Sequence, residues 1–187
     1  MLVRFGKRES RHHVTDCKTL DGHSEDKGRK AKQMDEQKRN FWEPCWACRV
    51  IAGESPGCIV TEARGVAVLI NPFPLSVGHA LVVPRQHIKN LYELPEDLAG
   101  PILSMAAQVA RAAKREFHAD GITLRQNNDA ASDQHLFHFH LHVIPRFNGD
   151  LDRFNAVPHP LSDSEQEAIG LQLRCAIVSA DGETTKT

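Results

Sequence analysis

The sequence predicts an α+β fold, with an antiparallel sheet of about five strands, one long helix and short flanking helices. Two apolar runs, 65–70 and 79–84, are separated by a Pro-rich loop, which is typical of paired strands. From Leu94 to about Phe117, apolar residues recur at spacings of three and four, as in an amphipathic helix. Further strand-like runs follow this helix, and this order of elements indicates helices packed against an antiparallel sheet.

The first 40 residues differ in character from the rest of the chain. They contain 11 Lys or Arg and 7 Asp or Glu, without a sustained apolar period, which predicts a mostly disordered charged extension. The run 44–53 begins with Pro44 and ends with Gly53, and this arrangement predicts a short helix.

The long helix should present one apolar face and then lead into two strands. Pro101 should bend or restart this helix because it lacks an N–H group. Strands are expected at 121–126 and 137–144, and a C-terminal helix at 164–176 before the polar end 182–187. The expected buried face of the long helix consists of Leu98, Ile102, Met105, Val109, Ala113 and Phe117.

The run 137–144 holds three histidines at alternate positions. His138, His140 and His142 alternate with apolar residues, as in a half-buried strand whose side chains point to opposite faces in turn. The histidines should then stand in a row, roughly 6.5–7 Å apart at about 3.3 Å of rise per residue. Imidazole serves as nucleophile, proton carrier or metal ligand near neutral pH, so the row suggests a reaction site.

Three interpretations of the row remain open from the residues alone. One histidine attacks phosphorus and forms a phosphoramidate, with phosphate donors supplied by the preceding loop. Alternatively, the histidines bind a catalytic zinc ion, or they are merely solvated. The candidate phosphate donors are Asn127, Asn128, Ser132 and Gln134.

The pair Cys45 and Cys48 forms a second candidate site. Their Cys-x-x-Cys spacing on a short helix allows both thiolates to bind one tetrahedral zinc ion, with two further ligands, expected to be histidines. A redox pair and two buried thiols are the alternatives.

The run from His138 to Ile144 resembles the signature of the histidine triad (HIT) family. The resemblance covers residues 41–150 and includes the hairpin 71–84, the segment 84–94 and the loop 126–134. It implies a HIT domain at 41–160, preceded by the extension 1–40 and followed by a C-terminal helix and polar tail at 161–187.

The resemblance also implies roles for individual residues. His140 corresponds to the family's nucleophile, His142 to the histidine that contacts phosphate and leaving group, and His79 to a partner behind the triad. In the nucleotide-binding part, Asn71 corresponds to a residue near the ribose, and Asn127 and Gln134 to residues of the phosphate loop.

Zinc-bearing members of the family add two histidines to their Cys-x-x-Cys pair. By this resemblance, Cys45, Cys48, His87 and His138 hold a structural zinc ion, while His140 stays free of metal. No catalytic cofactor is then required, although Mg²⁺ would accompany polyphosphate substrates.

The phosphate loop departs from the family pattern at three positions. Asp129 and Asp133 replace residues that are usually glycine, which permits positive φ and close approach of the backbone to phosphate. His135 replaces a Ser or Thr that donates to the leaving group, so His135 takes that acid role or is a neutral spacer.

The resemblance implies a nucleotide hydrolase or transferase that cleaves a nucleoside monophosphate linkage through a covalent nucleotidyl-histidine, acting on phosphoramidates or dinucleoside polyphosphates. The partners implied are a purine nucleotide or nucleotide conjugate and a second copy of the chain in a homodimer. The alternatives are a nucleotide-binding or interaction module with little turnover, and a zinc-dependent hydrolase that uses the histidine row as metal ligands.

Composition narrows the possible partners and the compartment. The net charge of −1 favours neither nucleic acid nor membrane, and no apolar run is long enough to span a bilayer. Five cysteines are an odd number, which favours a reducing, cytoplasmic setting over a disulfide framework.

Overall fold

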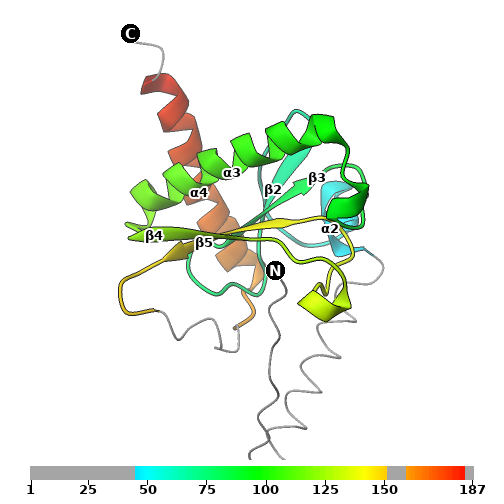
Figure 1. The fold of residues 1–187 in the computed structure, drawn as a ribbon. Coiled ribbons are helices and arrows are strands. Elements are labelled where there is room, and N and C mark those ends of the chain that lie inside the picture. Colours follow the sequence, from blue (N-terminus) through cyan, green and yellow to red (C-terminus); the bar gives the residue numbers. More distant parts are fainter. Residues whose placement is uncertain (1–44, 151–158, 184–187) are drawn as a thin grey trace, which may run out of the picture. The chain divides into compact units, whose positions relative to one another are not determined.

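The computed structural model describes residues 45–150 and 159–183, which form a five-stranded antiparallel sheet with helices on both faces (Figure 1). The strand order is β1-β2-β3-β5-β4, and each neighbouring pair is antiparallel. The predicted α+β class is therefore confirmed. The strands are β1 (Ile59–Ala63), β2 (Val66–Ile70), β3 (Ala80–Pro84), β4 (Gly121–Arg125) and β5 (Leu141–Arg146). The helices are α2 (Trp46–Ile51), α3 (Glu96–Glu116) and α4 (Asp163–Glu183), with short 3-10 turns at η1 (Leu91–Glu93) and η2 (Ala130–Ser132).

Three of the predicted strands coincide with β2, β3 and β4. Strand β1 was not located from the sequence, for two physical reasons. It is an edge strand whose exposure does not alternate, and its register against β2 shifts between Ile59 and Thr61. The period-2 signal that identifies a half-buried strand is therefore absent from β1.

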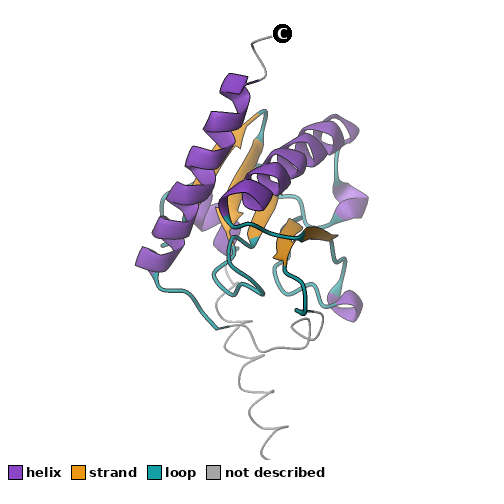
Figure 2. Ribbon diagram, turned by 90° about the vertical axis from the view of Figure 1, so that its left-hand side faces the viewer, coloured by secondary structure: helices purple, strands orange, loops and turns teal. Residues whose placement is uncertain are grey.

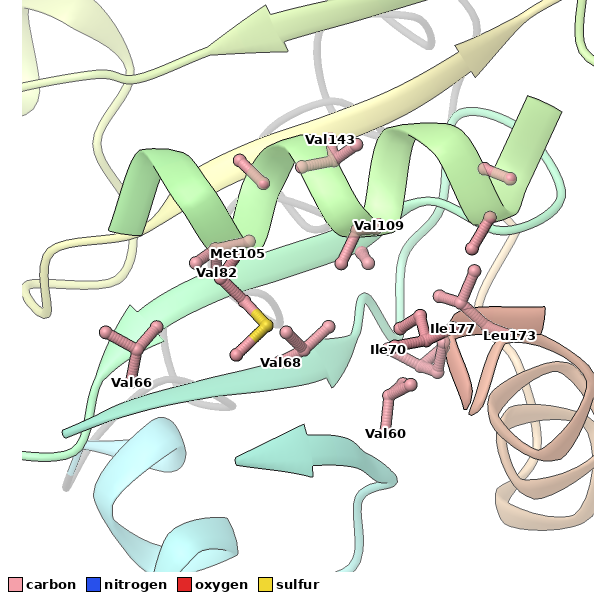
Figure 3. Packing of buried hydrophobic residues seen from close by; sticks show 14 of the residues in the cluster. Val60, Val66, Val68, Ile70, Val82, Met105, Val109, Val143, Leu173 and Ile177 are labelled. Carbon is pink, nitrogen blue, oxygen red and sulfur yellow. The ribbon is translucent and has the colours of Figure 1, made fainter. Parts of the chain in front are cut away.

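Helices α3 and α4 cover one face of the sheet. Alternate residues Val66, Val68 and Ile70 of β2 point towards these helices, as the pleat requires (Figure 3). Figure 3 shows Met105 and Val109 of α3 above these side chains, with Leu173 and Ile177 of α4 beside them. The predicted apolar face of α3 is confirmed.

Helix α2 covers part of the opposite face. Trp46 and Val50 pack against Leu69 of β2 and Leu81 of β3. Along their strands, these leucines alternate with residues that point to the other face, towards α3 and α4. Gly53 ends this segment with φ of 75°, a left-handed conformation that favours glycine. Backbone bonds from Gly53 to Val50 and from Glu54 to Arg49 close the helix end, as in a Schellman motif. The short helix predicted at 44–53 is thus present as α2, within that range.

Helix α3 runs through Pro101 as one element, so the predicted restart does not occur. Pro101 lies in the second turn, where its missing N–H removes only one bond near the helix N-terminus. Helix α4 is 21 residues long and extends beyond the predicted 164–176. Figure 2 shows α3 and α4 on the same side of the sheet. Among the described helices, none has the length and apolar character needed to cross a membrane.

Strand β5 begins at Leu141, four residues later than the predicted strand 137–144. The N–H of Phe139 donates to the carbonyl of Ile88 at 2.5 Å, beyond the end of β3, so this segment leaves the ladder. The expectation of three histidines in one row on a strand is therefore wrong: His142 lies on β5, whereas His138 and His140 precede it. The domain boundaries remain predictions, because the extension 1–40 lies outside the described residues.

Candidate active site and metal centre

The three histidines of the signature divide between two groups of side chains. The His138 ring packs edge-on against His87, with ring centroids 5.2 Å apart. The His140 and His142 rings pack against one another at 4.8 Å, and His142 packs against His79 at 5.1 Å. The first group is a candidate metal centre, and the second is a candidate catalytic centre.

The four predicted metal ligands converge on one point. The ligand atoms of Cys45, Cys48, His87 and His138 all lie within 4.8 Å of one another. The Sγ atom of Cys48 is 3.3 Å from Nδ1 of His87 and 3.4 Å from Nδ1 of His138, and Sγ of Cys45 is 3.3 Å from the same His138 atom. Zinc bonds of about 2.3 Å to sulfur and 2.0 Å to nitrogen put such atoms about 3.5 Å apart in a tetrahedron. The residues present therefore fit a zinc ion.

The surroundings of His138 suit a metal ligand. Its Nε2–H donates to the carbonyl of Pro84 at 2.8 Å, which leaves Nδ1 unprotonated and directed at the cysteines. Burial is the main cause that lowers the pKa of His138 to about 4, so the ring is neutral at pH 7. Burial, and then the hydrogen bond and charge of Cys45, raise the pKa of Cys48 to about 12. A bound cation reverses that effect, because coordination deprotonates a thiol.

His140 is buried, with 6% of its surface exposed. Its Nδ1–H donates to the carbonyl of His138 at 2.7 Å, so Nε2 carries the lone pair. Burial, and then the charges of Arg125 and His135, lower the pKa of His140, although the bond to His138 opposes this. The ring is therefore a neutral imidazole of defined tautomer, which is the form that acts as a nucleophile.

A chain of hydrogen bonds sets the tautomer of His142. The N–H of Leu75 donates to Nδ1 of His79 at 3.1 Å, so the proton of that ring lies on Nε2. This Nε2–H donates to Nδ1 of His142 at 2.9 Å, which places the His142 proton on its own Nε2. Burial lowers the pKa of His79 to about 3 and that of His142 well below its usual value. His142 therefore offers an Nε2–H donor while remaining neutral.

Asn71 holds His79 in place. Its Nδ2 atom lies 3.3 Å from both ring nitrogens of His79, and its Oδ1 accepts the N–H of Phe73 at 3.0 Å. The side chain is buried, so in this structure Asn71 supports the histidine chain.

The loop between β4 and β5 is braced from inside by Gln134. Its Oε1 accepts the N–H of Asp129 at 2.7 Å, and its Nε2 donates to the carbonyls of Lys89 and Leu136 at 2.7 and 3.1 Å. Only 2% of Gln134 is exposed. Its amide is thus engaged by backbone groups, and its observed position is that of a loop brace.

Two aspartates of this loop adopt positive φ, as the glycines they replace would. Asp133 is left-handed, with φ of 68° and ψ of 32°. Asp129 has φ of 65° and ψ of 163°, a region that few residues besides glycine adopt. The Asp133 carboxylate lies 2.8 Å from Nε2 of His135 and 3.3 Å from Nη2 of Arg125. Asp133 is largely exposed, and its charge lies between two basic side chains.

Arg125 is the residue that the sequence reasoning missed. It is the last residue of β4 and pairs directly with His142 across the strands, so both side chains share one face. Its Nε donates to Oδ1 of Asn127 at 3.1 Å, and its charge helps to lower the pKa of His79, His140 and His142. In the sequence, Arg125 could have been noticed as a single basic residue near the end of the predicted strand 121–126, immediately before the phosphate loop.

The comparisons with known proteins agree with this geometry. The HIT domain family matches residues 52–149. Protein hit of Bacillus subtilis is 37% identical over 115 residues, covering 62% of this chain and 79% of that protein. A Zn-bound histidine triad family protein from Mycobacterium smegmatis superposes with a TM-score of 0.66 and 30% identity, covering 75% of this chain and 97% of that one. The chain belongs to the HIT family, as the resemblance implied.

Two relatives carry an activity in their names. Adenosine 5′-monophosphoramidase hnt1 of Schizosaccharomyces pombe is 28% identical over 134 residues, covering 71% of this chain and 98% of that protein. Adenylylsulfatase HINT3 of Arabidopsis thaliana is 34% identical over 106 residues, covering 57% of this chain and 54% of that protein. Relatives of this chain in the family are thus named as nucleotide hydrolases.

Proposed function

We propose that this protein is a nucleotide hydrolase or transferase that cleaves a nucleoside monophosphate linkage through a nucleotidyl-His140 intermediate. The observation that carries the proposal is the tautomer of His140: the carbonyl of His138 accepts its Nδ1–H, and Nε2 holds the lone pair. The names of two relatives support an adenine nucleotide conjugate as substrate class.

The first step is attack by Nε2 of His140 on the α-phosphorus. A nitrogen–phosphorus bond forms, the bond from phosphorus to the leaving group breaks, and the leaving atom takes a proton. His142 donates its Nε2–H to a phosphate oxygen, and Asn127 supports the phosphate loop from its hydrogen bond with Arg125. Water then attacks the phosphorus, releases the nucleoside monophosphate and restores neutral His140.

The cluster of Cys45, Cys48, His87 and His138 would hold a structural zinc ion. When bound, the ion supplies a cross-link between α2, the segment after β3 and the segment before β5. The hydrogen bond from the His138 ring to the carbonyl of Pro84 also holds the His138 residue in place. The backbone carbonyl of His138 in turn accepts the Nδ1–H of His140. We further propose a homodimeric, cytoplasmic protein whose HIT domain spans 41–160 and whose chemistry needs no catalytic cofactor.

A covalent trap tests the nucleophile. Adenosine 5′-phosphoramidate labelled at phosphorus is mixed with protein, quenched in alkaline denaturant and examined by mass spectrometry of peptides. We expect an adenylyl group on His140, lost in His140→Ala and retained in His118→Asn. His118 is an exposed histidine outside the site, and asparagine tolerates its φ of 53°.

The outcome distinguishes the alternatives. Binding of AMP without any adduct or turnover in the wild type identifies a binding module. An adduct-free hydrolysis that a chelator abolishes in the folded protein identifies a zinc-dependent hydrolase. Either result overturns the proposed mechanism.

A further inference from the structure

We propose that Asp133, anchored by Arg125, positions His135 to exchange a proton with the leaving group. This inference rests on the proposed function and identifies what the departures in the phosphate loop do. Asp133 contacts His135 through one carboxylate oxygen, at 2.8 Å, and Arg125 through the other, at 3.3 Å. The backbone of Asp129, the other aspartate at positive φ, forms hydrogen bonds with Ser132 and Gln134 within the loop.

The sheet register places this arrangement beside the candidate catalytic histidines. Arg125 is the cross-strand partner of His142, and its side chain lies on the same face of the sheet. Its guanidinium binds Asn127 through Nε and Asp133 through Nη2, so one rigid group holds two points of the loop. Through Asp133, this anchor connects the His135 ring to the residue that lies opposite His142 in the sheet.

The contact defines the proton positions of His135. The carboxylate accepts the proton on Nε2, so proton exchange takes place at Nδ1. In the forward step, doubly protonated His135 gives its Nδ1 proton to the leaving nitrogen as the phosphorus–nitrogen bond breaks. The electron pair of that bond goes to nitrogen, and neutral His135 remains bonded to Asp133. In the hydrolytic step, the same Nδ1 takes a proton from the attacking water.

The charges explain how a carboxylate is tolerated near an anionic substrate. Arg125 and His135 flank Asp133. In the doubly protonated form of His135 that the forward step uses, the three side chains together carry one positive charge rather than a negative one. The carboxylate holds the tautomer of a neighbouring imidazole, which is the role of aspartate in serine hydrolase triads. Asp133 is thus a positioning residue, and His135 is the catalytic residue of the pair.

The experiment compares Asp133→Gly with Asp129→Gly in the full chain. Both substitutions place glycine at a positive φ, so both remove backbone strain, but only the first removes the contact to His135. Turnover is measured on adenosine 5′-phosphoramidate, whose amine leaving group needs a proton, and on the 4-nitrophenyl ester of AMP, whose leaving group does not. We expect Asp133→Gly to lower the ratio of the phosphoramidate rate to the ester rate about tenfold. This effect is small for general acid catalysis because the Asp133–His135 pair is solvent-exposed. Asp129→Gly should leave this ratio unchanged.

A spectroscopic readout accompanies the kinetics. The ¹⁵N shifts of His135 in the full chain, recorded at a pH high enough for the ring to be neutral, should report the Nε2–H tautomer in the wild type and in Asp129→Gly, and a tautomer mixture in Asp133→Gly. Asp133→Asn, which tolerates left-handed backbone but lacks the charge, should behave like Asp133→Gly.

Equal rate ratios in Asp133→Gly and Asp129→Gly, or an unchanged tautomer in Asp133→Gly, overturn the inference. Failure of the proposed function gives a different pattern: the wild type forms no adenylyl-His140 and turns over neither substrate, while the tautomer of His135 still depends on Asp133.

Discussion

The close approach of α4 to the edge of the sheet allows a sharp test of packing. Gly170 faces Cys58, the residue before β1, and a Cβ atom built on Gly170 would lie 2.1 Å from the Cys58 Sγ. Cβ of Cys58 and Cγ1 of Ile70 are 3.6 and 3.5 Å from the same point, so the Cβ has little room to move away. Gly170→Ala therefore forces α4 or Cys58 to shift.

Two opposing effects determine the magnitude. Overpacking in a well-packed core costs about 1–3 kcal/mol. Alanine in place of glycine inside a helix contributes up to about 1 kcal/mol in the opposite direction. The difference between the two effects is a net loss, and because the clash involves a buried sulfur atom we expect Gly170→Ala to lower the free energy of unfolding by up to about 2 kcal/mol.

Urea unfolding of five proteins measures the effect: the wild type, Gly170→Ala, Gly100→Ala, Cys58→Ala and the double variant of Cys58→Ala with Gly170→Ala. Gly100→Ala is the control for an added Cβ without a tertiary clash, because Gly100 lies in helix α3 and, apart from its chain neighbours and the nearby helix backbone, nothing lies within 4 Å of that Cβ. Alanine before Pro101 is disfavoured in a helix, so we expect this control to gain less than the full helix propensity of alanine and to lose less stability than Gly170→Ala. In a Cys58→Ala background the clashing sulfur is gone, so Gly170→Ala should become stabilising by up to about 1 kcal/mol. A stabilising Gly170→Ala in the wild-type background, or an equal loss with and without the Cys58 sulfur, would refute the steric argument.

Two further predictions concern the metal centre and the buried histidines. Cys48→Ser should lower the zinc content of the purified protein, measured by elemental analysis. It should also lower the melting temperature, because structural zinc binding contributes directly to folding. A full complement of zinc in this variant would contradict the assignment of Cys48 as a ligand. The pKa of His79 is about 3 in the fold and 6.5 in the unfolded chain, so between these values the unfolded state binds a proton that the folded state does not. Through His79 alone, the free energy of unfolding should therefore fall by up to about 1.4 kcal/mol per pH unit as pH drops from 6.5 towards 3. The lowered pKa values of His140 and His142 act in the same direction, so a flat profile of urea midpoint against pH would contradict the burial of neutral rings.

Local patterns were sufficient for most of the fold. Apolar runs of strand length correspond to β2, β3 and β4, and spacings of three and four identify the buried face of α3. The strand runs are informative because β2 and β3 are buried on both faces, and the helical spacing is informative because α3 buries one face. The edge strand β1 and the full length of α4 lacked such a signal, and both became evident only when their packing partners were known.

The order of residues along the chain was enough to identify the residue types that carry the chemistry and their spacing. It identified the signature around His140, the Cys-x-x-Cys pair and the unusual aspartates in the phosphate loop. Through the family resemblance, it also assigned His138 to metal and His140 to phosphorus.

Which atoms of those residues are available depends on contacts between segments that are distant in the sequence. The proton positions on His138, His140 and His79 depend on the carbonyl of Pro84, the carbonyl of His138 and the N–H of Leu75. Backbone groups are common to all residues, so no side-chain pattern along the chain encodes these partners. The contact of Asp133 with Arg125 and His135 likewise follows from the loop conformation and from the register that pairs Arg125 with His142.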